Sequence, residues 1–77
     1  MEENVLKILQ ELRPEFDFTD SDDFIEDGYL DSFDVVTLVS EIENQYQVLV
    51  DGLDVVPENF SSVEAICNLI NKSEKRD

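Results

Sequence analysis

The sequence predicts an all-α fold, a small antiparallel bundle of three main helices plus one short helical turn. Three observations support this prediction. Apolar residues recur at helical spacing in three separate segments. Proline, glycine, and acidic or hydroxyl side chains fill the stretches between these segments. The chain has 77 residues, of which 42% are hydrophobic, so it holds one small core and we expect a single domain over residues 1–77.

The first predicted helix spans about residues 3–13. Its apolar side chains recur every three or four residues and form one stripe, made of Val5, Ile8, Leu9 and Leu12. Pro14 ends this helix, because proline disfavours helical backbone geometry in the residue before it.

Residues 15–31 are predicted to form a long loop, since Asp, Glu, Ser and Thr dominate the segment and Gly28 interrupts it. A loop of this length needs anchors in a compact domain. We expect its scattered apolar side chains to pin it onto the core, namely Phe16, Phe18, Phe24, Ile25 and Leu30.

The carboxylates of this loop do not fit an EF-hand. That motif needs oxygen ligands and a glycine at fixed positions, and the possible registers place Ile25 at a ligand position or at the glycine position. No dedicated metal site is therefore predicted. Loose binding of divalent ions remains open for the acidic cluster of Asp20, Asp22, Asp23, Glu26 and Asp27.

The second helix is predicted over about residues 32–46. Its buried stripe consists of Val35, Leu38, Val39, Ile42 and Tyr46. Asp31 or Ser32 is a good N-cap, because a side-chain oxygen there accepts a hydrogen bond from an unpaired backbone N–H. Asp31 and Asp34 also place negative charge at the positive end of the helix dipole.

The remaining segment predicts one short turn and one last helix. Val48 and Val50 resemble an edge strand but have no apparent partner strand. Pro57–Phe60 is expected to form a single helical turn with proline first. Ser61 and Glu64 read as a capping box before a helix over about residues 62–72. The apolar face of that helix holds Val63, Ile66, Cys67 and Ile70, and Cys67 is expected to lie in the core as a small hydrophobe.

The charge of the chain restricts its partners. It has 20 acidic and 5 basic residues, a formal net charge of −15, and no basic residue between Pro14 and Asn71. Phosphate backbones are bound by Lys and Arg, so a nucleic-acid partner is disfavoured, and an anionic membrane surface is disfavoured for the same reason. The negative electrostatic field of such a chain favours partners with basic patches. The sequence has no run of about 18 apolar residues, so membrane insertion is not predicted.

The inventory of reactive side chains is short. The chain has no histidine and a single cysteine, so it lacks the usual ligands of a metal site and the usual base of a nucleophile. Serine catalysis within the chain is thereby excluded, and we expect a protein that is not an enzyme. The acidic N-terminus, Met1–Asn4, lacks the basic region of a signal peptide, so a cytoplasmic protein is expected. We also expect a monomer.

The segment Gly28–Phe33 lies where the long loop becomes the second helix, and it reads Gly-Tyr-Leu-Asp-Ser-Phe. Here the sequence resembles the acyl carrier protein family, whose attachment motif is Asp-Ser-Leu with a glycine shortly before it. Phe33 stands where leucine is usual. The acidic helix after Ser32 and the stretches Val56–Phe60 and Ser62–Ile66 also look like the corresponding parts of the family, so the resemblance covers nearly the whole chain.

The resemblance implies that 4'-phosphopantetheine is attached to Ser32, beside Asp31, by a magnesium-dependent phosphopantetheinyl transferase that uses coenzyme A. The terminal thiol of this arm would carry cargo as a thioester. Acyl cargo for fatty acid or polyketide synthesis and aminoacyl cargo, D-alanyl or peptidyl, both remain open. An alternative of a different class is an acidic interaction or adaptor module without a prosthetic group, in which Ser32 only caps the helix.

The second helix also predicts a docking patch for the transferase and for acyl-transferring or acyl-activating enzymes. Val36 lies out of phase with the buried stripe, and Phe33 lies one turn earlier near the same face. Burial of Phe33 against the loop remains open as an alternative. In such a patch carboxylates steer the partner and apolar atoms anchor it. The expected members are Phe33, Asp34, Val36, Glu41 and Glu43.

Overall fold

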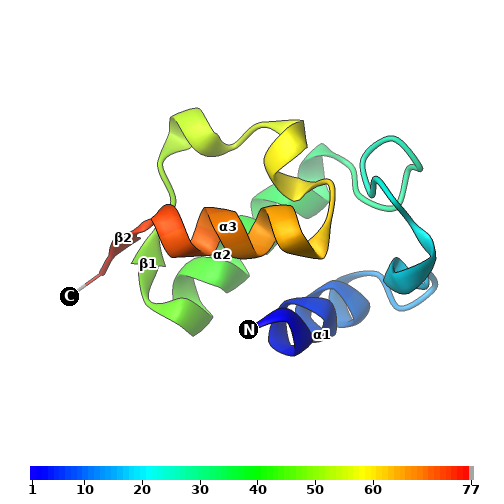
Figure 1. Cartoon of the computed structure of the whole chain (residues 1–77), viewed down its shortest axis with the longest axis horizontal. Helices are drawn as coiled ribbons and strands as arrows, with labels where there is room; N and C mark the ends of the chain where they lie inside the picture. Colours follow the sequence, from blue (N-terminus) through cyan, green and yellow to red (C-terminus); the bar gives the residue numbers. More distant parts are fainter. Residues whose placement is uncertain (77) are drawn as a thin grey trace.

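The computed structural model describes residues 1–76 (Figure 1). Three α-helices dominate it: α1 (Glu2–Leu12), α2 (Ser32–Tyr46) and α3 (Val63–Lys72). Short 3-10 turns and two very short strands complete it: η1 (Phe18–Asp20), β1 (Val48–Leu49), η2 (Gly52–Asp54), η3 (Pro57–Phe60) and β2 (Glu74–Lys75). The predicted all-α bundle of three main helices is confirmed. In Figure 1, α1 runs opposite to α2 and α3, and the segment that joins α2 to α3 returns along the top of the view.

The apolar stripes of the three helices meet in one core. Val5, Ile8 and Leu9 come from α1, Leu38 and Ile42 from α2, and Ile66, Leu69 and Ile70 from α3. Side chains from the connecting segments fill the remaining space: Phe18, Phe24, Leu30, Val48 and Phe60. Cys67 does not reach the fully buried core but packs against it while partly buried, and this burial raises the pKa of its thiol.

The long loop is pinned to the core as predicted, with Phe18, Phe24 and Leu30 buried. Phe24 donates a backbone hydrogen bond to the Ser61 carbonyl at 2.8 Å, which ties the loop to the segment before α3. Phe16 stacks on Tyr29 with ring centroids 4.5 Å apart, so the two ends of the loop lie together. Gly28 has φ of 77°, a left-handed conformation that glycine adopts without strain, and it turns the chain toward Asp31.

The segment after α2 does have a strand partner, contrary to the sequence-based expectation. β1 pairs antiparallel with β2, placing Val48 opposite Lys75 and Leu49 opposite Glu74. The amide of Arg76 extends the contact to the Gln47 carbonyl at 2.7 Å. The partner could not be recognised from sequence, because Glu74 and Lys75 carry no apolar strand pattern and the pairing rests on backbone groups.

The predicted capping box before α3 is wrong by one residue. The N-cap is Ser62, whose hydroxyl oxygen accepts a hydrogen bond from the Ala65 amide at 3.0 Å. Ser61 instead donates its hydroxyl proton to the Glu58 carbonyl at 3.1 Å and so closes η3. Because Ala65 rather than Glu64 occupies the third helical position, no acidic side chain returns to the cap.

Candidate functional site

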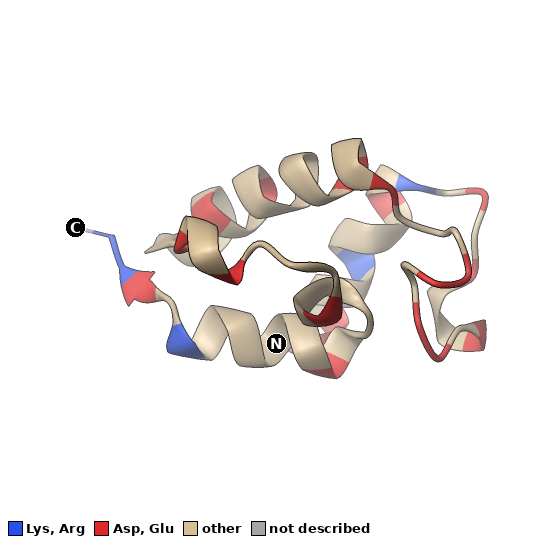
Figure 2. Cartoon of the chain, turned by 90° about the horizontal axis from the view of Figure 1, so that it is seen from above, with Lys and Arg blue, Asp and Glu red and all other residues tan. Residues whose placement is uncertain are grey.

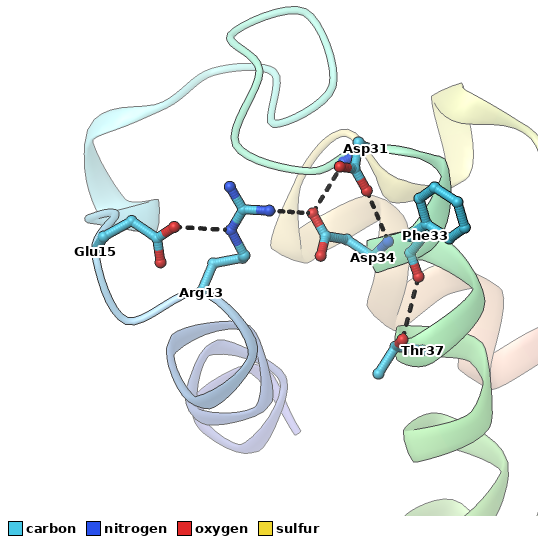
Figure 3. Close-up of polar contacts among 6 residues, drawn as sticks. All are labelled: Arg13, Glu15, Asp31, Phe33, Asp34 and Thr37. Carbon is cyan, nitrogen blue, oxygen red and sulfur yellow. Dashed lines mark hydrogen bonds and ion pairs between the residues drawn. The ribbon is translucent and has the colours of Figure 1, made fainter.

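Ser32 is the first residue of α2 and is exposed to solvent. The cap of this helix is Asp31, whose Oδ1 accepts a hydrogen bond from the Asp34 amide at 2.9 Å. In return Asp34 Oδ2 accepts the Asp31 amide at 3.1 Å, which completes a reciprocal capping box (Figure 3). The hydrogen bond that the Asp34 amide donates lowers the pKa of the Asp31 carboxyl. The helix is therefore capped without Ser32, whose hydroxyl is not needed for that role.

Asp34 differs from the expectation that it faces a partner. It is 8% exposed, and besides closing the capping box its Oδ2 accepts a hydrogen bond from Arg13 Nη1 at 2.8 Å. The other side of the guanidinium, Nε, donates to Glu15 Oε2 at 3.0 Å (Figure 3). The sequence predicts Asp34 as a carboxylate that steers a partner beside the apolar pair Phe33 and Val36. Here its partner, Arg13, comes from the end of α1, and the carboxylate is occupied within the chain.

The two apolar members of the predicted patch are exposed. Phe33 is 83% exposed and Val36 is 67% exposed, so inward packing of Phe33 is ruled out. In Figure 3 the Phe33 ring points away from Asp34 and Arg13. The Thr37 hydroxyl donates to the Phe33 carbonyl at 3.1 Å, a bond within the first turns of α2 that leaves the ring free.

The two glutamates of the predicted patch have different surroundings. Glu41 is exposed. Glu43 is half-buried, and its Oε2 accepts a hydrogen bond from the Val50 amide at 3.0 Å. Glu43 is therefore less exposed than the sequence predicts, because the chain folds back after β1 and the Val50 amide uses this carboxylate; its role in partner binding stays a prediction. The exposed members, which we call the docking patch, are Phe33, Val36 and Glu41.

A cleft of about 410 Å³ opens beside Ser32. Its walls come from three segments: the end of the long loop, the first turns of α2, and the segment before η3. Most of the lining is apolar, supplied by Ile25, Leu30, Val35, Val36, Val55 and Val56. Cavities of this size accommodate small organic ligands, and apolar lining favours apolar ones. Asp31 and Ser32 stand at its edge, so a group on the Ser32 hydroxyl has an apolar space next to it.

The surroundings of the site are acidic. Figure 2 shows acidic residues over the long loop and α2, with basic residues toward the end of α1 and the C-terminal segment. Within residues 1–76 no group of three or more His, Cys, Asp or Glu side chains is arranged to hold a metal ion. None of the helices that the structure describes is long and apolar enough to cross a membrane.

Sequence reasoning missed Arg13 and the cleft. Arg13 gave one usable signal, since it is the last basic residue before a long segment without any. Its partner lies 21 residues away, which no local pattern reveals. The far wall of the cleft, Val55 and Val56, lies in an irregular segment without helical spacing, so its side chains could not be assigned a direction.

Comparison with known proteins agrees with this geometry. The family model described as "Phosphopantetheine attachment site" matches residues 3–70. No curated protein and no solved structure matches the sequence significantly. The family match includes the Asp31–Ser32 turn, the whole of α2 and most of α1 and α3. Members of this family are non-catalytic carriers with a covalently attached 4'-phosphopantetheine group. With a match that covers most of its length, this chain belongs to the phosphopantetheine attachment site family and is a phosphopantetheine carrier protein.

Proposed function

We propose that this carrier holds its 4'-phosphopantetheine on Ser32 and carries acyl groups as thioesters at the end of that arm. The observation that carries the assignment is the exposed Ser32 hydroxyl at the N-terminus of a 15-residue helix already capped by Asp31. A phosphodiester there would meet backbone N–H groups and the positive end of the helix dipole. With no histidine in the chain, a separate transferase must deprotonate the hydroxyl.

The cleft beside Ser32 supports acyl rather than aminoacyl cargo. Its lining is dominated by branched aliphatic side chains, and burying apolar area contributes about 25 cal/mol per Å². An acyl chain gains from entering such a space. An aminoacyl group carries an ammonium charge, which would lose its hydration against these apolar side chains. The one carboxylate of the lining, Asp31, already accepts the Asp34 amide in the capping box.

The docking patch supports partners with an apolar pocket and a basic rim. Phe33 directly follows Ser32 and Val36 lies one turn further, so both offer exposed apolar atoms near the attachment serine, and Glu41 adds charge on the same helix. Aromatic side chains commonly anchor interfaces, and charges at the rim speed encounter with a partner of opposite sign. The transferase and the acyl-handling enzymes would share this surface, because each must reach Ser32 or the arm attached to it.

Attachment is tested by mass spectrometry after incubation with coenzyme A, Mg²⁺ and a broad-specificity phosphopantetheinyl transferase. We expect one phosphopantetheine on the wild-type chain and none on Ser32→Ala. Ser40→Ala is the matched control, because Ser40 is another exposed serine of α2 and its loss should leave loading intact. Loading of Ser32→Ala, or no loading of the wild type, would refute the assignment and favour an adaptor without a prosthetic group.

Cargo class is tested by loading the arm from acyl-coenzyme A thioesters of increasing chain length and from an aminoacyl thioester. If acyl chains enter the cleft, the Tm should rise with chain length over the first several carbons, since each buried CH₂ contributes about 0.8 kcal/mol at most. The aminoacyl form should melt like the unacylated arm. Equal Tm values for all acyl lengths would argue against binding of the acyl chains in the cleft.

A further inference from the structure

Arg13 contacts residues that form a connected network around the Asp31–Ser32 turn. Its guanidinium group donates to Asp34 Oδ2 at 2.8 Å and lies 5.2 Å from the centroid of the Phe16 ring. Phe16 stacks on Tyr29, with the two ring planes 7° from parallel. Tyr29 precedes Asp31 by two residues, and Asp31 is joined to Asp34 by the capping box. The contacts thus connect the end of α1, both ends of the long loop and the first turn of α2.

The contacts hold the backbone on both sides of Ser32. Asp34 Oδ2 accepts both the Asp31 amide and the Arg13 guanidinium, so one oxygen joins the turn before Ser32 to a cation on another helix. The Asp34 side chain is 11% exposed, and it therefore depends on partners inside the protein. Removal of Arg13 would leave the negative charge of the Asp34 carboxylate without its paired cation. The carboxylate would then rotate toward water, and this rotation would open the capping box.

Only an arginine makes all of these contacts at once. Nη1 faces Asp34, Nε faces Glu15, and the planar group lies over the Phe16 ring. A lysine ammonium is a single point charge on a flexible stem and cannot present two fixed donors and a flat face together. Within residues 1–76, Arg13 is the only basic residue that forms an ion pair with Asp34.

We propose that Arg13 is a positioning residue for the loading of this carrier: acting through Asp34, it fixes the Asp31–Ser32 turn so that the Ser32 hydroxyl is presented to the transferase in one orientation. The inference rests on the proposed attachment at Ser32. It separates two roles on one surface. The docking patch governs encounter, and Arg13, which lies outside that patch, governs the orientation of the nucleophile after encounter.

The separation predicts a specific kinetic signature. Loading of Arg13→Ala should show a kcat about tenfold lower, because a misplaced reacting group loses rate, while the KM for the carrier stays near the wild-type value. Arg13→Lys should be intermediate. In an Asp34→Ala background, which leaves Arg13 no side-chain oxygen at this position, the further change Arg13→Ala should have no additional effect on kcat, because the residue acts through that carboxylate.

Lys72→Ala is the matched control. It removes one positive charge and an ion pair, Lys72 Nζ to Asp54 Oδ1 at 3.4 Å, in a part of the chain that does not contact Ser32. Its kcat and KM should equal those of the wild type. Amide hydrogen exchange provides a readout independent of the transferase: in Arg13→Ala the Asp31 and Asp34 amides should exchange faster, while those in the middle of α2 stay protected.

The outcomes separate this inference from the proposed function. A wild-type chain that is not loaded refutes the attachment at Ser32 and this inference with it. A loaded wild type together with an Arg13→Ala variant of equal kcat and equal exchange refutes only the positioning role. An equal rise in KM and fall in kcat would also refute it, since that pattern indicates general disorder. If Arg13→Ala does not fold, Arg13→Lys decides: a wild-type kcat overturns the proposal and a reduced kcat at unchanged KM supports it.

Discussion

Glu43 accepts a hydrogen bond from the backbone amide of Val50 at 3.0 Å, and this contact joins the last turns of α2 to the segment that follows β1. The carboxylate is half-buried and satisfies a backbone donor that would otherwise lack a partner near the core. Glu41 lies two residues earlier on the same helix but is exposed. Two acidic residues of similar sequence context therefore have different physical roles.

The difference between these glutamates gives the first prediction. Glu43→Lys should lower the free energy of unfolding by about 1–2 kcal/mol, because the Val50 amide loses a charged acceptor. Glu41→Lys should change it by about 0.5 kcal/mol or less. Chemical denaturation monitored by circular dichroism measures both. Glu41→Lys should instead slow association with a basic partner, an effect that fades as salt is added. Equal stability of the two variants would show that the Glu43 contact contributes nothing.

The second prediction concerns Phe33. Its ring is 83% exposed, so Phe33→Ala should leave the free energy of unfolding within about 0.5 kcal/mol of wild type. If the ring anchors a partner, the same change should raise the KM for the transferase about five- to tenfold, which corresponds to about 1–1.4 kcal/mol of binding. Leu53→Ala is the matched control, because Leu53 is 86% exposed but lies on η2, outside the docking patch. Equal KM values for both variants would place the anchor elsewhere.

The features that were predictable from the sequence are those encoded locally. The stripes of Val5, Ile8 and Leu9 in α1 and of Leu38 and Ile42 in α2 repeat at helical spacing, so the helices and the place of Ser32 at a helix start follow from neighbours in the chain. The exposure of Val36 followed from the same geometry, because it is out of phase with the stripe.

The features that were not predictable depend on residues distant in sequence. The burial of Asp34 depends on Arg13, which lies 21 residues before it. β2 pairs through backbone groups whose side chains, Glu74 and Lys75, are charged and exposed. Hydrogen-bond partners of this kind depend on the tertiary structure. The sequence around a polar side chain does not indicate whether that side chain faces water or another segment.

The third prediction concerns salt. The chain carries a net charge of −15 in a body whose longest dimension is 35 Å. At about 0.01 M salt the Debye length is about 30 Å, so most of the carboxylates repel one another, whereas at about 0.15 M it is about 8 Å. Raising salt across this range should raise the Tm by several degrees, since about 1 kcal/mol shifts the Tm of a domain this size by about 4–8 °C.

Magnesium at matched ionic strength separates screening from binding. If screening alone acts, MgCl₂ and NaCl should raise the Tm equally. A larger effect of MgCl₂ would indicate that the acidic long loop binds divalent ions. A Tm independent of both salts would contradict the repulsion argument, because it would mean that the charges are locally compensated.

The fourth prediction uses the Asp31 cap. The hydrogen bond from the Asp34 amide lowers the pKa of the Asp31 carboxyl below its ordinary value of 3.8, so the unfolded chain takes up this proton more readily than the folded chain. The contribution to stability is therefore fully present above about pH 3.8 and is lost as the pH falls through the lowered pKa of the folded state.

Asp31→Asn isolates this contribution, because the amide oxygen still caps the helix but carries no charge at any pH. At pH 7 the variant should melt at a lower temperature than wild type, since it loses the favourable interaction between the carboxylate and the helix dipole. As the pH falls through the lowered pKa of Asp31, the difference should shrink, because the protonated carboxyl is then as uncharged as the amide. Protonation of the other carboxylates affects both proteins alike and cancels in the comparison. Asp22→Asn, in the exposed long loop, controls for the loss of one negative charge: because it removes only a repelling charge, it should not lower the Tm at pH 7 as Asp31→Asn does. A wild-type advantage that persists unchanged from pH 7 to pH 2 would mean that the ionised Asp31 carboxylate does not stabilise the start of α2.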